Sequence, residues 1–428
     1  MQKIKKMFLF FILISFCKVS VFPQTDETYE KLGIFVDIME IINANYVLET
    51  KPKSLVVNAI KGMVGSLDPF SQYMEEKAYK DMQTETDGSY GGIGLRIMIK
   101  NANLTVVSPL PGTPAYKAGI LPEDRIIKIN GKSAVGMSTD KAVDIMRGKV
   151  GKKVKLTISR GRDTKEIDFE LVREKIKIET VESTVLDGNV VYVRLTEFNS
   201  QSADDMQKVL LNCESQNMKA LILDLRNNPG GLLESALKII SIFMSERKLV
   251  LTTKGPGQDT KKEYFSEGGG VFFDLPIVIL VNKGSASASE IVSGAMQDFK
   301  RALIVGSNTF GKGSVQTVFP LSDGTALRLT IAKYYLPSGR QIDRSNEKEA
   351  KNGITPDINV DVTIEEEIKL YANADVLFKK DKKDTKKGLK DNNLEDKALN
   401  KALEIIRENK VMESIEASRV LSTLNKKK

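Results

Sequence analysis

The sequence predicts an α/β fold in which a small strand-rich module separates a helical N-terminal region from a layered core. Two patterns carry this prediction. Over residues 189–360, apolar runs of strand length alternate with amphipathic helices, as in layered α/β domains. Over residues 90–172, shorter strands are broken by turns, which indicates a compact binding module. The chain has 428 residues, 41% of them hydrophobic, so it can bury several cores.

The individual elements follow from apolar periodicity and turn residues. The core has predicted strands over residues 190–195, 220–225, 276–281 and 302–305, and predicted helices over 203–211, 232–244 and 289–299. The module has predicted strands over residues 95–99, 104–107, 125–129, 153–160 and 165–172, and a helix over 139–147. Further helices are predicted over residues 29–46, 54–63 and 394–406, the last in a Lys-rich tail that starts near residue 364.

The N-terminus has the layout of a secretory signal. Three lysines precede an apolar run over residues 7–16, which is short for a membrane span. The stretch that follows offers no convincing small-x-small cleavage site, so an uncleaved membrane anchor is the alternative. Cys17 suggests a lipoprotein, but Phe16 stands where a small residue is expected, which disfavours lipidation.

Charge and composition exclude several classes of function. The net charge is +8, but the excess lies mainly in residues 1–24 and 371–428, so the presumed folded body is nearly neutral and nucleic acid is not an expected partner. Cys213 is the only cysteine beyond Cys17, which excludes an intramolecular disulfide in an exported chain and a Cys-rich metal site. We expect Cys213 to be a small buried hydrophobe, and we expect no metal and no cofactor.

The chain contains no histidine. A Ser-His-Asp unit, a Cys-His unit and a His-ligated metal site are therefore excluded. Any proton transfer near neutral pH must use a carboxylate, a tyrosine or a lysine with a shifted pKa.

Ser287 lies in the run Gly284-Ser285-Ala286-Ser287-Ala288-Ser289-Glu290, after a predicted buried strand and before a predicted helix. Ser287 and Glu290 match the S-x-x-E capping box, so an ordinary helix cap is one interpretation. A serine at such a turn is also exposed as a nucleophile would be, and the N–H groups of the helix start can stabilise an oxyanion.

A serine nucleophile needs a base, and Lys312 in Gly311-Lys312-Gly313 is the candidate. Its pKa would have to fall by about three units, which requires a desolvated site. The alternatives are a solvated loop lysine or a lysine that contacts phosphate. Residues 306–313 fit a Walker A loop only if Gly313 replaces Ser or Thr, which disfavours nucleotide binding. Gln316 could orient the lysine amine through its side-chain oxygen, or it could be a strand-surface residue.

A third segment, Asp224-Leu225-Arg226-Asn227-Asn228-Pro229-Gly230-Gly231, ends a predicted strand and opens a helix. Its two glycines can present backbone N–H groups to an anion. A plain connection between strand and helix is the alternative.

These motifs together resemble the carboxyl-terminal processing peptidases, the tail-specific proteases of family S41 with a Ser-Lys pair. The resemblance covers residues 67–360 and includes Leu67-Asp68-Pro69 and Pro337-Ser338-Gly339-Arg340 beside the segments above. It implies a crotonase/ClpP-like layered α/β protease core with Ser287 as nucleophile, Lys312 as base and Gln316 as its aid. It also implies an oxyanion hole made by the N–H groups of Ala288 and of Gly230 or Gly231.

The resemblance further implies that the module is an inserted PDZ domain, with Gly92-Ile93-Gly94-Leu95 as its carboxylate-binding loop. Such a domain would bind protein or peptide substrates with unstructured C termini. The expected regions are 1–24 (signal peptide or membrane anchor), 25–88 (helical region), 89–172 (PDZ domain), 173–363 (serine protease core) and 364–428 (charged helical tail).

The function expected on this basis is a serine endopeptidase that captures and cleaves protein tails in the periplasm or cell envelope. A catalytically inert PDZ-bearing assembly protein predicts the same fold, but the presence of all three catalytic side chains disfavours it. An acyl-CoA lyase or hydratase of the crotonase type is a second alternative, but Ser287 and a PDZ module would have no purpose in such an enzyme. The helices near both ends could make a homo-oligomer or pack within one chain.

Overall fold

The computed structural model describes residues 26–161, 165–257, 260–342, 353–372, 378, 395–411 and 413. The chain divides into two units, Met1–Tyr73 and Met74–Lys428. The first unit contains helices α1 (Asp26–Asn45) and α2 (Pro52–Gly65), which confirms the two helices predicted there. Its last residues enter the short strand β1 (Gln72–Met74). In the described part of the chain, no helix is both long enough and apolar enough to span a membrane.

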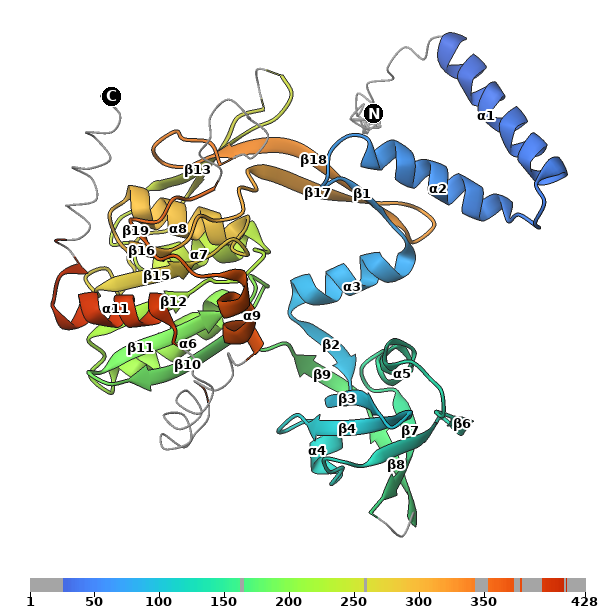
Figure 1. The fold of residues 1–428 in the computed structure, drawn as a ribbon, viewed down its shortest axis with the longest axis horizontal. Helices are drawn as coiled ribbons and strands as arrows, with labels where there is room; N and C mark the ends of the chain where they lie inside the picture. Colours follow the sequence, from blue (N-terminus) through green and yellow to red (C-terminus); the bar gives the residue numbers. More distant parts are fainter. Residues whose placement is uncertain are drawn as a thin grey trace, which may run out of the picture. The chain divides into compact units, whose positions relative to one another are not determined.

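The second unit begins with helix α3 (Glu76–Asp87), which leads into the module. The module is a sheet in the order β3-β4-β5-β7-β8, with β6 paired to β5. Figure 1 shows its strands β3, β4, β7 and β8. Its elements are β3 (Leu95–Lys100), β4 (Asn103–Pro109), α4 (Pro114–Lys117), β5 (Arg125–Ile129), β6 (Lys132–Ser133), α5 (Thr139–Met146), β7 (Lys153–Arg160) and β8 (Lys165–Val172). All five strands and the helix predicted for the module are confirmed.

The two ends of the module lie side by side. Strand β2 (Ser89–Gly92) enters it and β9 (Glu174–Lys177) leaves it, and the two pair antiparallel from Ser89↔Lys177 to Gly92↔Glu174. An insertion whose entry and exit strands pair in this way can be accommodated in the chain without breaking the core that it interrupts. The apolar side chains of the module form their own buried cluster, separate from those of the core.

The core is built on a sheet in the order β10-β11-β12-β15-β16-β19. Strands β11 (Val190–Leu195), β12 (Ala220–Asp224), β15 (Ile277–Val281), β16 (Leu303–Gly306) and β19 (Ile358–Asn359) run parallel, and β10 (Val181–Leu186) pairs antiparallel with β11. The four strands predicted for the core are confirmed. Their side chains are buried on both faces, as the continuous apolar runs indicate.

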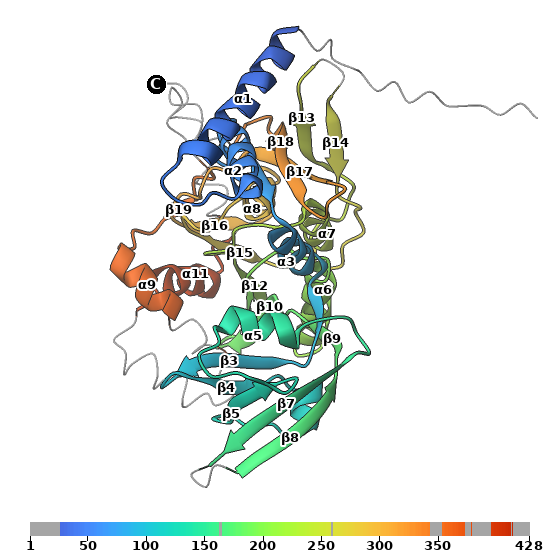
Figure 2. The same cartoon turned by 90° about the vertical axis from the view of Figure 1, so that its right-hand side faces the viewer.

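Helices cover both faces of this sheet. Helices α6 (Ser202–Glu214), α7 (Leu233–Ile242) and α8 (Ala288–Asp298) contribute to the cluster that contains Val191, Leu221 and Ile279. The opposite face, with Tyr192, Ile222 and Leu280, packs against helix α11 (Lys397–Arg407). Figure 2 shows α6 and α7 on one side of the sheet and α11 on the other. The core is therefore the three-layered α/β domain that the alternating pattern predicts.

A second, antiparallel sheet extends from the core. It includes β13 (Leu249–Lys254), β14 (Lys262–Phe265), β17 (Ser314–Pro320) and β18 (Ala326–Tyr335), and β18 pairs with both β13 and β17. Helix α9 (Ile364–Ala372) follows β19.

Candidate active site

Three loops meet at the carboxyl edge of the core sheet. One joins β12 to α7, one joins β15 to α8, and one joins β16 to β17. Because β12, β15 and β16 are parallel neighbours, their carboxyl ends lie at the same edge of the sheet. The fold therefore brings together the three segments that contain Gly230, Ser287 and Lys312.

Ser287 occupies a strained turn at the start of α8. Its backbone φ is 54° and ψ is −114°, a conformation that residues other than glycine rarely adopt. It caps α8, and its side chain is half-buried. The glutamate half of the predicted capping box is formed, because Ser287 N–H donates to Glu290 Oε2 over 2.9 Å. A strained serine between a buried strand and a helix has the geometry of a nucleophile elbow.

Glu290 joins the turn that contains Ser287 to the loop that contains Lys312. Its side chain is fully buried, and each of its carboxylate oxygens accepts two hydrogen bonds. Oε2 accepts from the N–H groups of Ser287 (2.9 Å) and Lys312 (2.8 Å). Oε1 accepts from Gly311 N–H (2.7 Å) and Thr309 Oγ1 (2.5 Å). Burial raises the pKa of Glu290, and these hydrogen bonds act in the opposite direction.

Lys312 lies in a partly desolvated environment that lowers the pKa of its amine. Its side chain is partly buried, and its pKa is lowered from 10.5, mainly by burial and also by the charge of Arg328, while the Glu290 charge opposes the shift. Tyr334 donates its hydroxyl to the Lys312 carbonyl oxygen. A lysine with a lowered pKa carries a larger neutral fraction at pH 7, and only the neutral amine can accept a proton.

Gln316 lies on β17, at a bulge in its pairing with β18. Its side-chain amide nitrogen donates to Ser314 Oγ over 2.8 Å and to Thr330 Oγ1 over 3.4 Å. These two contacts fix the orientation of the amide group.

Gly230 approaches the turn at Ser287 so closely that a side chain would not fit. Its φ is +105°, and an added Cβ would lie 2.8 Å from Ser287 Cβ and 2.9 Å from Ala288 N. Gly230 N–H donates to Asn228 Oδ1 over 2.9 Å, which engages this donor within the loop. Two hydrogen bonds flank the next residue, Gly231: Phe198 N–H donates to Gly230 O, and Leu232 N–H donates to Phe198 O. Within the described residues, the N–H of Gly231 itself donates to no acceptor.

Asn228 is a buried residue whose importance the sequence did not reveal. Its side-chain nitrogen donates to Leu195 O over 2.7 Å, and its own carbonyl oxygen accepts from Ala286 N (3.0 Å) and Ser289 Oγ (2.9 Å). Asn228 therefore joins the loop 227–231, called the glycine loop below, to the turn that contains Ser287. The sequence predicted Glu290 only as part of a helix cap, and the apolar residues Ile291 and Val292 that follow it directly were the only local sign that its side chain is buried.

The candidate carboxylate-binding loop of the module lies between β2 and β3. Gly94 has φ +75°, and its carbonyl oxygen accepts from Leu110 N–H over 2.9 Å. Ile93 is buried, and its carbonyl oxygen accepts from Ala115 N–H over 2.9 Å. Strand β3 begins at Leu95, lies at one end of the sheet order and packs beside α5. An end strand beside a helix is the place where a peptide can add to the sheet.

The remaining predictions concern metals and Cys213. No group of three or more potential ligands that could hold a metal ion occurs within the described residues. Cys213 is a free, buried cysteine on α6 that packs in the core, as predicted.

Comparison with known proteins identifies the class. The model of peptidase family S41 matches residues 189–360, a PDZ domain model matches residues 105–160, and the N-terminal domain of the activating protease CtpB matches residues 19–78. These regions correspond to the core, the module and the N-terminal region, so the class is a serine peptidase with a PDZ domain.

Two curated relatives extend the match over most of the chain. A carboxy-terminal-processing protease of Bartonella bacilliformis is 42% identical over 348 residues, covering 80% of this chain and 78% of the relative. The carboxy-terminal processing protease CtpA of Bacillus subtilis is 36% identical over 355 residues, covering 83% and 73%. A solved photosystem II D1 C-terminal processing protease is 29% identical over 77% of this chain and 92% of its own, with a TM-score of 0.43. The chain belongs to the carboxy-terminal processing proteases of peptidase family S41.

Proposed function

We propose that this serine peptidase cleaves proteins near their C termini with Ser287 as nucleophile and Lys312 as general base. The observation that carries the proposal is the shared carboxylate of Glu290, whose Oε2 accepts from the N–H groups of both residues. Two further observations support it, namely the strained conformation of Ser287 and the lowered pKa of Lys312.

In the first step, Lys312 Nζ accepts the hydroxyl proton of Ser287 while Oγ attacks the carbonyl carbon of the scissile peptide bond. The tetrahedral intermediate collapses, the C–N bond breaks, and Lys312 returns the proton to the leaving amine. Water then attacks the acyl-enzyme with Lys312 again as base, which releases the acid product and restores the serine. Gln316 keeps the lysine side chain oriented during both steps.

The oxyanion of the intermediate accepts hydrogen bonds from backbone N–H groups of Ala288 and the glycine loop. Ala288 is the first residue of α8, so its N–H has no acceptor within the helix. Of the two glycines, Gly231 is the better candidate because Gly230 N–H donates to Asn228. Each such donor contributes about two to three orders of magnitude to the rate.

The PDZ domain selects the substrate. Its loop Gly92-Ile93-Gly94-Leu95 binds the terminal carboxylate, and the tail adds as a strand along β3. Residues 1–24, which lie outside the described residues, direct export to the periplasm or cell envelope, as a cleaved signal or as an anchor. The regional division is 25–88, 89–172, 173–363 and 364–428, and the terminal helices could support a homo-oligomer.

A serine-reactive acylating probe tests the assignment of the two residues. The parent protein should be labelled on Ser287, as located by mass spectrometry of its peptides. Ser287→Ala should not be labelled, and Lys312→Ala should be labelled at least about 100-fold more slowly while remaining folded. Labelling that persists in Ser287→Ala would refute the nucleophile, and a parental rate in Lys312→Ala would refute the base.

A further inference from the structure

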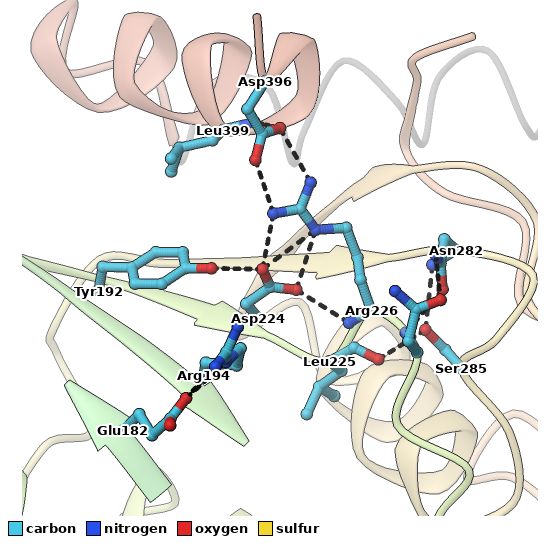
Figure 3. Close-up of polar contacts among 11 residues, drawn as sticks. Glu182, Tyr192, Arg194, Asp224, Leu225, Arg226, Asn282, Ser285, Asp396 and Leu399 are labelled. Carbon is cyan, nitrogen blue, oxygen red and sulfur yellow. Dashed lines mark hydrogen bonds and ion pairs between the residues drawn. The ribbon is translucent and has the colours of Figure 1, made fainter. Parts of the chain in front are cut away.

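A buried charge cluster links the C-terminal helix to the glycine loop. The Arg226 guanidinium lies between two carboxylates, that of Asp224 at the end of β12 and that of Asp396 before α11 (Figure 3). Arg226 Nη1 and Nη2 donate to the two Asp396 oxygens over 2.9 and 2.8 Å, and Nη2 also donates to Asp224 Oδ2 over 2.7 Å. The Asp224 carboxylate accepts a further bond of 2.5 Å from the Tyr192 hydroxyl.

Apolar packing also holds α11 on the sheet. The helix already buries Ala398, Leu399, Ala402 and Ile405 against the apolar face of the sheet. Burying charges costs desolvation energy, and apolar residues of similar volume often stabilise a fold as well as a buried ion pair does. A bidentate contact fixes the position of the Arg226 guanidinium between its two carboxylate partners. Apolar packing cannot supply this geometry.

Asp396 is held rigidly as well. Its Oδ1 caps α11 by accepting from Leu399 N–H over 3.0 Å. Burial acts to raise the pKa of Asp396, but the Arg226 charge and the N–H groups at the helix start outweigh burial and lower this pKa. The carboxylate is therefore charged at neutral pH, and a movement of α11 would move the partner of Arg226.

The neighbours of Arg226 in the chain contact the loop that contains Ser287. The preceding carbonyl, Leu225 O, accepts from Ser285 Oγ over 2.7 Å, and Asn227 and Asn282 bond to one another through both backbone and side-chain groups. Figure 3 shows the contact between Ser285 and Leu225 near the Arg226 side chain. Asn228 then binds the segment around Ser287, and Gly230 lies against Ser287 Cβ.

We propose that Asp396 is a positioning residue for the peptidase site. Asp396 fixes Arg226, so the position of the docked helix α11 sets the position of the loop 227–231. The loop in turn sets the position of the Ser287 turn and of the oxyanion donors. The C-terminal helix is then part of the apparatus that determines kcat. This inference rests on the proposed roles of Ser287 and the glycine loop.

The test compares three variants of the full chain by steady-state cleavage of a peptide. Asp396→Asn keeps the cap, since asparagine is a good N-cap, but removes the charge opposite Arg226. Its kcat should fall about tenfold or more, because catalysis depends on donors placed within a fraction of an ångström, while KM stays within about twofold. Asp396→Glu restores the charge on a longer side chain and should give a kcat between those of the parent and Asp396→Asn.

Ala402→Gly is the matched control. It weakens α11 and its packing without touching Arg226, so it should lower the melting temperature but leave kcat unchanged well below that temperature. A parental kcat in Asp396→Asn, or an equal loss of kcat in folded Ala402→Gly, would overturn the positioning role. If Asp396→Asn does not fold, folded Asp396→Glu decides: a reduced kcat at unchanged KM supports the role and a parental kcat overturns it. Failure of the proposed function is seen separately, as activity of the parent that survives Ser287→Ala.

Discussion

The backbone N–H groups of Ser287 and Lys312 donate to the same atom, Oε2 of Glu290, over 2.9 and 2.8 Å. The two residues are 25 positions apart in the sequence and belong to different loops. One buried carboxylate thus keeps the proposed nucleophile and the proposed base beside each other.

Replacement of this carboxylate should uncouple the two loops. In Glu290→Gln, one carboxylate oxygen becomes an NH₂ group that faces N–H donors, and each buried donor left without an acceptor costs about 1–3 kcal/mol. We expect a lower melting temperature and a loss of kcat of about 100-fold or more in the protein that remains folded. Glu365→Gln, at an exposed position in the first turn of α9, is the control and should behave as the parent. A Glu290→Gln variant with parental kcat would contradict the coupling.

The lowered pKa of Lys312 predicts how activity depends on pH. In the proposed mechanism the neutral amine is the active form, so kcat/KM should rise with pH and level off above the Lys312 pKa, which lies below 10.5. The chain has no histidine, so no imidazole contributes to the rise of kcat/KM with pH. The measurement is kcat/KM against pH with a substrate that does not titrate. A flat profile up to pH 10.5 would contradict a lysine base.

The same shift predicts an effect on stability. The folded-state pKa of Lys312 is below its unfolded value, so between the two values the unfolded chain binds more protons and stability rises with pH. Lys312→Met removes the desolvated charge of the amine and, with it, this pH dependence of the free energy of unfolding. We expect it to melt at a higher temperature than the parent at neutral pH, with the difference shrinking as the pH approaches 10.5. Thermal melts across this range check the sign, and a variant that melts below the parent would contradict it.

The close approach of Gly230 predicts a sharp effect of a single methyl group. Gly230→Ala places Cβ 2.8 Å from Ser287 Cβ, at a φ of +105°, so the glycine loop must move away from the turn at Ser287. We expect kcat to fall by about 100-fold or more through the displaced oxyanion donors. Gly188→Ala has a similar φ of +87° with open space around Cβ, so it carries the backbone strain without the contact. Equal activity of the two variants would contradict the role of the loop.

A second pair of glycine substitutions tests whether the PDZ domain captures the peptide C terminus. Gly94 and Gly112 both have φ +75°, but a Cβ on Gly94 would lie 2.3 Å from Thr113 Cβ, whereas Gly112 faces open space. Gly94→Ala should distort the carboxylate loop and raise KM for a peptide with a free C terminus by about tenfold. The comparison is KM for free and C-terminally amidated peptides. Amidation should raise KM in the parent and in Gly112→Ala but not in Gly94→Ala, and a parental KM in Gly94→Ala would contradict capture by this loop.

The strands of the core and of the PDZ domain were predictable because their signals are local. Strand β11 coincides with the predicted residues 190–195, and β5, β7 and β8 also begin and end where predicted. Each is an apolar or alternating run that ends at turn residues. Helix α3 was not predicted, since it buries none of its side chains completely and therefore shows no clear apolar stripe.

The site was predictable only in part. The motifs around Ser287, Lys312 and Gly230 could be read locally, and the resemblance to a known family gave them roles. The contacts that join them depend on the folded chain. Glu290 reaches the lysine loop across 22 positions, and Arg226 reaches Asp396 across 170. No local pattern predicts a polar contact at such a separation.

The most direct test of the Ser-Lys assignment is cleavage of a peptide with an apolar, unstructured C terminus by the parent protein, Ser287→Ala and Lys312→Ala. We predict cleavage by the parent and a loss of at least about 1,000-fold in kcat in each variant, with melting curves that show all three to be folded. Because the two residues act as a unit, the double variant should be no slower than the slower single variant. Parental cleavage by folded Lys312→Ala or Ser287→Ala would contradict the account.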